Sequence, residues 1–213
     1  MNVEDLQSVD SKKMYQVYDS WPQISKESFG NNLKEFDVKN IDHIVFVGMG
    51  SSGSIGDVIS SILSKEDIHV SNVKGYHLPK TVDSNSLIVT VSVSGNTQET
   101  LTVLQNAQKT NAKIAAFSSG GKMQKFCNTN NLFFQEISMI HSPRASFTKF
   151  LFSILKTLQE IIPINEADVK ESISVLNKTR NNVFSSNLEE DNVSLRLASW
   201  IKTIPLIYYP WGL

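Results

Sequence analysis

The sequence predicts an α/β fold in which a mostly parallel, five-stranded sheet is covered by helices on both faces. Short runs of apolar and β-branched residues alternate with segments whose apolar residues recur at helical spacing. The central run is Leu87-Ile88-Val89-Thr90-Val91, which lacks the polar alternation of a half-exposed strand. Such a run is typical of a parallel strand buried on both faces. Strands that alternate with helices in this way form the three layers of an αβα sandwich.

The composition excludes several classes of protein. Of 213 residues, 20 are basic and 21 acidic, so the net charge is −1 and a nucleic-acid partner is not expected. No apolar run approaches the roughly 20 residues that span a bilayer, and the polar N-terminus is unlike a secretory signal. The single cysteine, Cys127, excludes an internal disulfide and suits a reducing compartment. We therefore expect a cytoplasmic protein without a membrane partner, in which Cys127 is structural.

Residues 1–37 are predicted to be helical and to precede the sheet. Apolar residues recur at helical spacing over 14–18, and the Trp21-Pro22 pair then interrupts the pattern. A second helix is predicted over 24–36. The first strand follows at 44–47, after a short polar turn.

The first strand runs into a glycine-rich turn that reads Gly48-Met49-Gly50-Ser51-Ser52-Gly53, and a helical stripe follows over 55–62. A G-x-G-x-x-G turn between a strand and a helix is the dinucleotide fingerprint, which expects an acidic residue about 20 positions later to hold a ribose. Residues 69–75, at the end of the second strand, contain no carboxylate. The nicotinamide alternative therefore lacks its ribose ligand. The turn can still hold an anion at the start of the following helix.

The central strand leads into a turn of small hydroxyl residues, Ser92-Val93-Ser94-Gly95-Asn96-Thr97, and then into a helix. Free backbone N–H groups and the positive end of the helix dipole point at such a turn. Ser92, Ser94 and Thr97 add donors that do not repel a phosphate. The alternative is that Ser94 or Thr97 only caps the helix, with Glu99 supporting its first turn.

Two further strands, 113–117 and 132–137, complete the predicted sheet, and the turn 118–121 follows the first of them. Like 48–54 and 92–97, this turn is rich in glycine or hydroxyl residues and directly follows a strand. The carboxyl ends of parallel strands lie at one edge of a sheet, where open α/β folds bind ligands. We therefore expect the three turns to contribute to one binding site.

Residues 142–146 open a long helix that Pro163 ends. Arg144 lies at the start of this helix, where the dipole disfavours a cation. It is either an exposed loop arginine or a group that faces an anionic substrate or transition state. The helix has an apolar face that begins with Phe147 and Phe150 and is too wide for a lone surface helix. This face predicts packing against another subunit or lobe.

The C-terminal part of the chain predicts a helix over 165–180, then a polar stretch that leads to 193–201, and a last strand over 204–208. The histidines show no metal-ligand spacing, so no metal is assigned. They are His43, His69, His77 and His141. The sequence contains neither the nucleophile elbow of hydrolases nor the phosphate loop of NTPases.

Four motifs occur in one order along the chain and together resemble the sugar isomerase (SIS) domain, more narrowly the archaeal-type bifunctional phosphoglucose/phosphomannose isomerases. They are the turn 48–53, the segment 92–100, Ser118-Ser119-Gly120-Gly121-Lys122 and Pro143-Arg144-Ala145-Ser146. The resemblance covers roughly residues 14–213. It implies a flavodoxin-like sandwich and two such lobes in one chain. We accordingly expect a helical segment at 1–37, an SIS domain at 38–180, and a linker with the start of a truncated second lobe at 181–213.

The resemblance also implies roles for matching residues in the isomerisation of glucose 6-phosphate or mannose 6-phosphate to fructose 6-phosphate, without a cofactor. Arg144 would stabilise a cis-enediolate near C1 and C2 of the sugar. Gly50 and Ser51 would allow close approach of the backbone, although Ser51 replaces the glycine usual in the family's GMGGS turn. The phosphate would be held by hydroxyl side chains, those of Ser52, Ser92, Ser94 and Thr97.

The family's glutamate base, ring-opening histidine and late lysine follow the part of the family that this sequence matches, so none has a counterpart here. Glu189 and Glu190 precede the expected second-lobe strand, and Glu99 would face the wrong end of the sugar. Isomerisation requires a base within hydrogen-bond reach of the C2 proton. We therefore expect this chain alone to bind a sugar phosphate with little or no turnover.

The alternative is a non-catalytic phosphosugar-binding module. The apolar helix face and the open edge of the last strand predict a homodimer.

Overall fold

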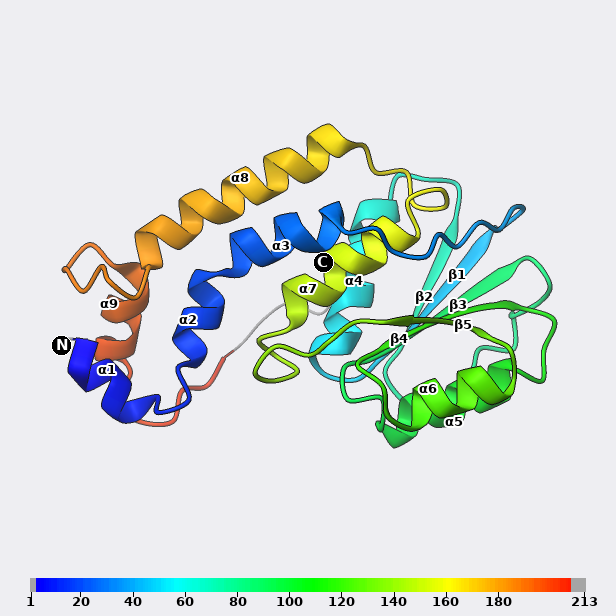
Figure 1. Cartoon of the computed structure of the whole chain (residues 1–213), viewed down its shortest axis with the longest axis horizontal. Helices are drawn as coiled ribbons and strands as arrows, with labels where there is room; N and C mark the ends of the chain where they lie inside the picture. The colour runs from blue at the N-terminus through cyan, green and yellow to red at the C-terminus, as the bar shows by residue number, and fades with distance from the viewer. Residues whose placement is uncertain (1–2, 208–213) are drawn as a thin grey trace. The chain divides into compact units, whose positions relative to one another are not determined.

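The computed structural model describes residues 3–207 and divides the chain into an α/β unit, 27–164, and a helical unit formed by the segments before and after it. The α/β unit contains a five-stranded sheet in the order β2-β1-β3-β4-β5, and every neighbouring pair is parallel (Figure 1). The strands are β1 (His43–Val47), β2 (His69–Val73), β3 (Ser86–Ser92), β4 (Lys113–Ser118) and β5 (Phe133–Glu136). The predicted fold class is confirmed.

Burial follows the predicted strand pattern. All residues of β3 and of β1 are buried, whereas β2 at one edge is only partly covered. Central parallel strands have helices on both faces, so both sets of side chains leave water. The continuous apolar run at 87–91 has this physical origin.

Helices cover both faces of the sheet. Helices α5 (Gln98–Ala107) and α6 (Gly121–Thr129) lie together on one side, and α4 (Ser51–Leu63) and α7 (Phe147–Thr157) lie on the other (Figure 1). One buried cluster joins the α5 and α6 side chains to the sheet and includes Leu104, Met123 and Ile88. Fully buried Ile55, Ile59 and Phe150 come from the helices of the opposite side.

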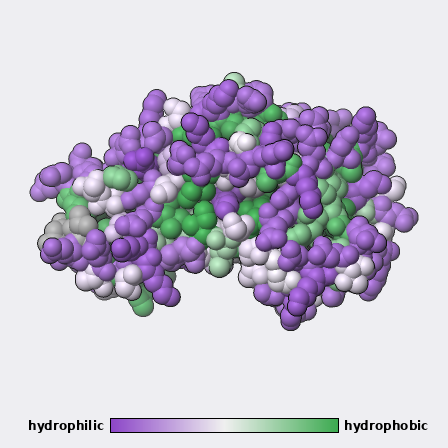
Figure 2. All heavy atoms as spheres, viewed as in Figure 1, coloured by the Kyte–Doolittle hydropathy of each residue, from purple (hydrophilic) through white to green (hydrophobic). Residues whose placement is uncertain are grey.

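The helical unit consists of α1 (Val3–Val9), α2 (Met14–Asp19), the start of α3 (Trp21–Gly30), α8 (Glu166–Val183) and α9 (Val193–Trp200). Asn165 caps α8 by accepting a 2.8 Å hydrogen bond from Asp168 N, and Asn192 caps α9 by accepting one of 3.1 Å from Leu195 N. Most of α8 is exposed, and the surface over it is hydrophilic (Figure 2). No helix within residues 3–207 combines the length and apolarity needed to cross a bilayer.

The predicted interruption before Trp21-Pro22 is confirmed, because α2 ends at Asp19, but both bounds of the second helix are wrong. This helix, α3, begins at Trp21 and not at residue 24, since a proline in the first helical turn removes no intrahelical hydrogen bond. The helix predicted to reach residue 36 ends at Gly30. Phe36 instead packs against Phe133, with ring centroids 4.7 Å apart, and this contact stabilises an extended segment.

Two predictions about the C-terminal half also need correction. Phe150 and Ile154 are fully buried within the single chain, so the central part of the apolar face of α7 needs no second subunit to cover it. Residues 204–207 form no strand, because no strand among the described residues pairs with them. Tyr208, the last residue of that predicted strand, lies outside the described residues.

Candidate functional site

The sheet order brings the three predicted turns to one edge. Strands β1, β3 and β4 are neighbours and parallel, so the turns that follow them leave the sheet side by side. Helix α5 begins directly after its turn, and α4 and α6 begin at Ser51 and Gly121, within the other two predicted turns. The site therefore combines three helix N-termini at the carboxyl edge, the arrangement in which parallel sheets bind anions.

The turn 92–97 does not use its hydroxyl side chains as helix caps. Thr97 is the N-cap residue of α5, yet among the described residues its side chain makes no capping hydrogen bond. Its Oγ1 instead lies 2.9 Å from Oγ of buried Ser92. Ser94 is exposed, and its Oγ accepts a 3.3 Å hydrogen bond from Asn96 N. The first N–H groups of α5 thus lack a side-chain cap and are available to an anion.

The turn 92–97 is joined closely to the turn 118–121 that follows β4. Ser119 N donates to Val93 O at 3.0 Å, and Met123 N donates to Gly95 O at 2.9 Å. Gly95 has φ +67°, and a Cβ there would lie 1.8 Å from Gly120 O. A glycine is therefore required at residue 95 for both its φ and its close contact.

Asn96 connects the same two turns and was not singled out by the sequence analysis. Its Nδ2 donates to Ser94 O at 2.9 Å, and its Oδ1 accepts from Lys122 N at 3.1 Å. One amide side chain therefore stabilises the turn that carries Ser94 and links it to the start of α6. An asparagine after a turn glycine is the only sequence signal for this role, and such a residue often bonds to its own backbone.

The glycine-rich turn after β1 brings backbone close to the binding edge. Gly50 has φ +55° and is exposed, with nothing within 4 Å of a Cβ built on it. A Cβ at Gly48 would lie 2.8 Å from the backbone of Ser52, so strand and helix pack tightly here. Ser52 is buried and Ser51 half-buried at the start of α4. The Ser51 side chain fits this turn, where the family usually has a glycine.

Arg144 lies beside this glycine-rich turn. Ser51 Oγ donates a 3.4 Å hydrogen bond to Pro143 O, which holds the 142–146 segment against the start of α4. Buried Ser146 stabilises the segment, because its Oγ accepts from Ile140 N at 2.8 Å and donates to backbone carbonyls. Arg144 is exposed and has no ion pair within residues 3–207. Among the described residues, no acidic side chain is therefore paired with this guanidinium.

Lys149 is a second cation near this edge and was missed from the sequence. Its Nζ donates to Oγ of Ser138 at 2.6 Å, two residues after the end of β5. Burial lowers the pKa of Lys149, and nearby Glu27 opposes this shift. A lysine in the first turn of an apolar helix is usually a surface residue, so the sequence offers no specific signal for it.

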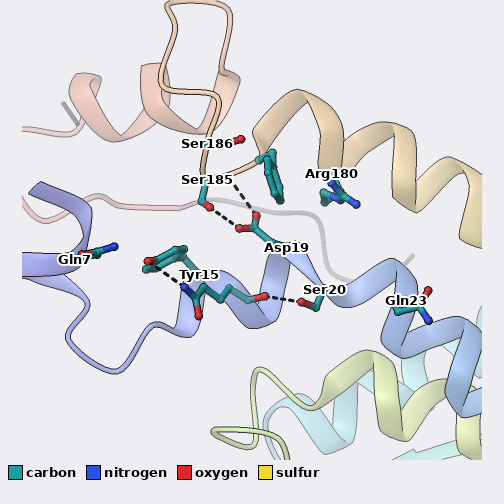
Figure 3. Close-up of a pocket in the computed structure, with 10 residues that line it drawn as sticks. Gln7, Tyr15, Asp19, Ser20, Gln23, Arg180, Ser185 and Ser186 are labelled. Atoms are coloured by element: carbon teal, nitrogen blue, oxygen red, sulfur yellow. Dashed lines mark hydrogen bonds between the residues drawn. The ribbon is translucent and has the colours of Figure 1, made fainter. Parts of the chain in front are cut away.

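Other candidate groups do not belong to this site. Burial raises the pKa of the Cys127 thiol to about 11, so Cys127 is unsuited to act as a nucleophile. The described part of the chain contains no cluster of three or more histidine, cysteine or acidic side chains able to hold a metal ion. Two cavities of about 630 and 420 Å³ lie in the helical unit, and their described linings contain no predicted site residue. Figure 3 shows the larger of the two.

Comparisons with known proteins agree on one family. The SIS domain family matches residues 38–158. The bifunctional phosphoglucose/phosphomannose isomerase of Caldicellulosiruptor bescii is 34% identical over 90% of this chain and 58% of its own length. The enzyme of the same name from Thermoplasma acidophilum is 31% identical over 81% of this chain and 51% of its own. The chain therefore spans about half the length of the curated relatives it matches.

Among solved structures, the chain is similar to the C-terminal domain of glucosamine-fructose-6-phosphate aminotransferase from Francisella tularensis. The TM-score is 0.58 at 18% identity, and the match covers 80% of this chain and 54% of that chain. At this identity the similarity concerns the fold alone.

Proposed function

Because the chain belongs to the SIS domain family, we propose that it binds a phosphorylated sugar at the carboxyl edge of its sheet. The proposal assigns the phosphoryl group to the starts of α4 and α5. Ser52, Ser92, Ser94 and Thr97 provide hydroxyl groups there, and Gly50 and Ser51 provide backbone. A phosphate dianion suits this place because N–H groups and the positive ends of helix dipoles converge on it.

The observation that carries the proposal is the start of α5. Thr97 stands at the N-cap, but its hydroxyl bonds to Ser92, and the exposed Ser94 accepts from Asn96 N, before the helix, so the described residues provide no side-chain cap. A helix start is normally capped by a side chain, by water or by a ligand. The bond between Ser92 and Thr97 orients two hydroxyls in advance of binding. This arrangement favours a ligand over simple helix capping.

For the reaction, we infer that Arg144 acts on the sugar and not on its phosphate. Aldose–ketose isomerisation moves a proton from C2 to C1 through a cis-enediolate, and a cation near its oxygens stabilises the developing charge. Arg144 is exposed, has no ion pair among the described residues and lies beside the glycine-rich turn. The base that removes the C2 proton is not among the residues assigned here. Isomerisation is thus proposed for the whole protein, and sugar-phosphate binding for this chain.

A titration of the chain with fructose 6-phosphate tests the binding proposal. Ser94→Ala removes one hydrogen bond to a charged group, so we expect the affinity to fall by about tenfold or more. Ser61→Ala is a matched control, because Ser61 is exposed in α4 and its Oγ donates to Asp57 O of the same helix. Equal affinities of the Ser94 variant and the control would contradict the proposal. Binding of NAD in place of the sugar phosphate would instead favour the dinucleotide alternative.

A coupled assay with glucose 6-phosphate and mannose 6-phosphate separates the enzyme from a non-catalytic phosphosugar-binding module. The second candidate is favoured by the absence of a carboxylate from the turns 48–54, 92–97 and 118–121. Turnover by this chain alone at an ordinary enzymatic rate, roughly 1–10³ per second, would show that it contains the base. If the chain turns over at all, Arg144→Gln is expected to lower kcat and leave phosphate binding nearly unchanged.

The homodimer remains a prediction, as does a cytoplasmic location. The central side chains of the apolar face of α7 are buried within the chain, so this part of the face is no argument for a dimer. Light scattering at micromolar concentration tests the prediction directly. A monomeric mass would contradict it.

A further inference from the structure

The larger cavity of the helical unit has the size and lining of a small-molecule site. Its volume is about 630 Å³, within the range of about 300–1,000 Å³ typical of ligand pockets. It lies between α2, the start of α3 and the end of α8 (Figure 3). Most of the residues that line it carry an amide, hydroxyl or charged group, among them Gln7, Gln16, Asp19 and Arg180, and the Phe184 ring lies beside them.

The acidic group of this cavity already has hydrogen-bond donors. Asp19 accepts from both the backbone N and the Oγ of Ser185, which joins α2 to the segment after α8 (Figure 3). These two hydrogen bonds from Ser185 hold the Asp19 carboxylate in one orientation in the cavity lining. Asp19 makes no ion pair with Arg180, the cation of the same cavity.

Arg180 is held in place without an acidic partner. Its guanidinium carbon lies 4.7 Å from the centroid of the Phe184 ring, a cation–π contact that orients the side chain. Within residues 3–207 the guanidinium forms no ion pair, and its buried Nε has no hydrogen-bond partner. Arginine presents a planar set of donors that matches carboxylate and phosphate oxygens. Here the guanidinium is oriented by Phe184, but among the described residues it forms no ion pair.

The second cavity extends the positive surface around Arg180. It has a volume of about 420 Å³, shares Arg180 and Gln23 with the first cavity, and adds Lys26 and Lys170 to its lining. Lys170 pairs with Glu166 on the same helix, but both side chains are 77% exposed and the pair is weak in water. The two cavities together are therefore lined by three cations, Arg180, Lys26 and Lys170, and by one carboxylate, Asp19, which accepts two hydrogen bonds from Ser185.

We propose that the groove formed by these two cavities is a binding site for a small anion that carries a phosphoryl or carboxylate group, with Arg180 as its main contact. The amide and hydroxyl side chains of the lining would bind the polar remainder of the ligand. The site is separate from the sheet edge, because all its residues belong to the helical unit. It does not depend on the function proposed for that edge.

Nuclear magnetic resonance of the full chain tests the site with two probes, inorganic phosphate and citrate. We expect the Arg180 Nε–H signal and the Gln7 and Gln16 side-chain amide signals to shift on titration. Shifts with phosphate alone identify a phosphoryl ligand, and shifts with citrate alone a carboxylate ligand. Absence of shifts with both probes overturns the proposal. Signals of Ser94 and Asn96 report the sheet edge, so the two sites succeed or fail independently.

Substitutions separate a specific site from general attraction of anions. Arg180→Gln should weaken binding by about tenfold or more, as expected when charge-assisted hydrogen bonds are lost. Lys178→Gln removes the same charge from the same helix at an exposed residue outside both linings, and should leave affinity nearly unchanged. Equal losses in the two variants would overturn the proposal. Should Arg180→Gln fail to fold, Arg180→Lys keeps the charge but not the planar fork, and unaltered affinity there would also contradict the assignment.

Discussion

Replacing Gly95 by alanine tests whether the two turns at the binding edge are as closely joined as the structure indicates. The Cβ would lie 1.8 Å from Gly120 O and 2.8 Å from Gly120 C, both in the backbone. A Cβ essentially never comes within 3.0 Å of a heavy atom of a residue that is not its chain neighbour, so the turns must separate by about 1 Å. A flexible side chain could move aside cheaply, but this carbonyl belongs to the start of α6.

The expected cost has two parts. Alanine at φ +67° is strained by about 1–3 kcal/mol. Separation of the turns also breaks or weakens the bonds from Ser119 N to Val93 O, from Met123 N to Gly95 O and from Lys122 N to Asn96 Oδ1. At about 0.5–1.5 kcal/mol each, these add a comparable amount, for a total loss of roughly 3–6 kcal/mol. Domains of this size are stable by only about 5–15 kcal/mol, so the variant should be severely destabilised.

Urea denaturation followed by circular dichroism measures this loss, with Gly50→Ala as the matched control. Gly50 also has a positive φ, +55°, but a Cβ there meets nothing within 4 Å. The control should therefore lose only the strain, about 1–3 kcal/mol. If the two variants lose the same free energy of unfolding, the close contact between residues 95 and 120 does not exist and the geometry of the site must be revised.

Three further predictions concern single side chains. Burial is the larger cause that lowers the pKa of His43 below 6.5, and the charge of the neighbouring His69 is the second. The contribution of this shift to stability is therefore complete above pH 6.5 and is lost as the pH falls below that value. Urea denaturation on either side of pH 6.5 should show a smaller fall in the free energy of unfolding for His43→Gln than for the parent chain. Cys127, buried and with a pKa of about 11, should react with a thiol reagent only in denaturant, and rapid labelling of the native chain would refute its burial. Asn96→Ala should lower stability by about 1–3 kcal/mol, because it removes one hydrogen bond within the turn 92–97 and one from this turn to the start of α6. It should also weaken binding of fructose 6-phosphate, and unchanged affinity would show that Asn96 does not position the turn.

The sequence by itself determined the sheet and the edge at which the candidate site lies. Buried parallel strands need continuous apolar residues, so the strands at 44–47, 87–91 and 113–117 could be read directly. Because strands that alternate with helices lie parallel in one sheet, the turns that follow them leave the sheet at the same edge. The order of residues along the chain is sufficient for such inferences, since strand and helix periodicities are local.

The tertiary structure alone decided the features that depend on partners distant in the sequence. The Asn96 side chain bonds to the backbone of Lys122, and the carbonyl of Gly120 leaves no room for a Cβ at residue 95. Arg180 and Asp19 line one cavity although 161 positions separate them. The segment 204–207 reads as a strand but remains unpaired, because a strand forms only where another strand supplies hydrogen bonds. A local sequence pattern indicates which secondary structure a segment can form. Whether the segment forms it depends on contacts with residues that are distant in the sequence.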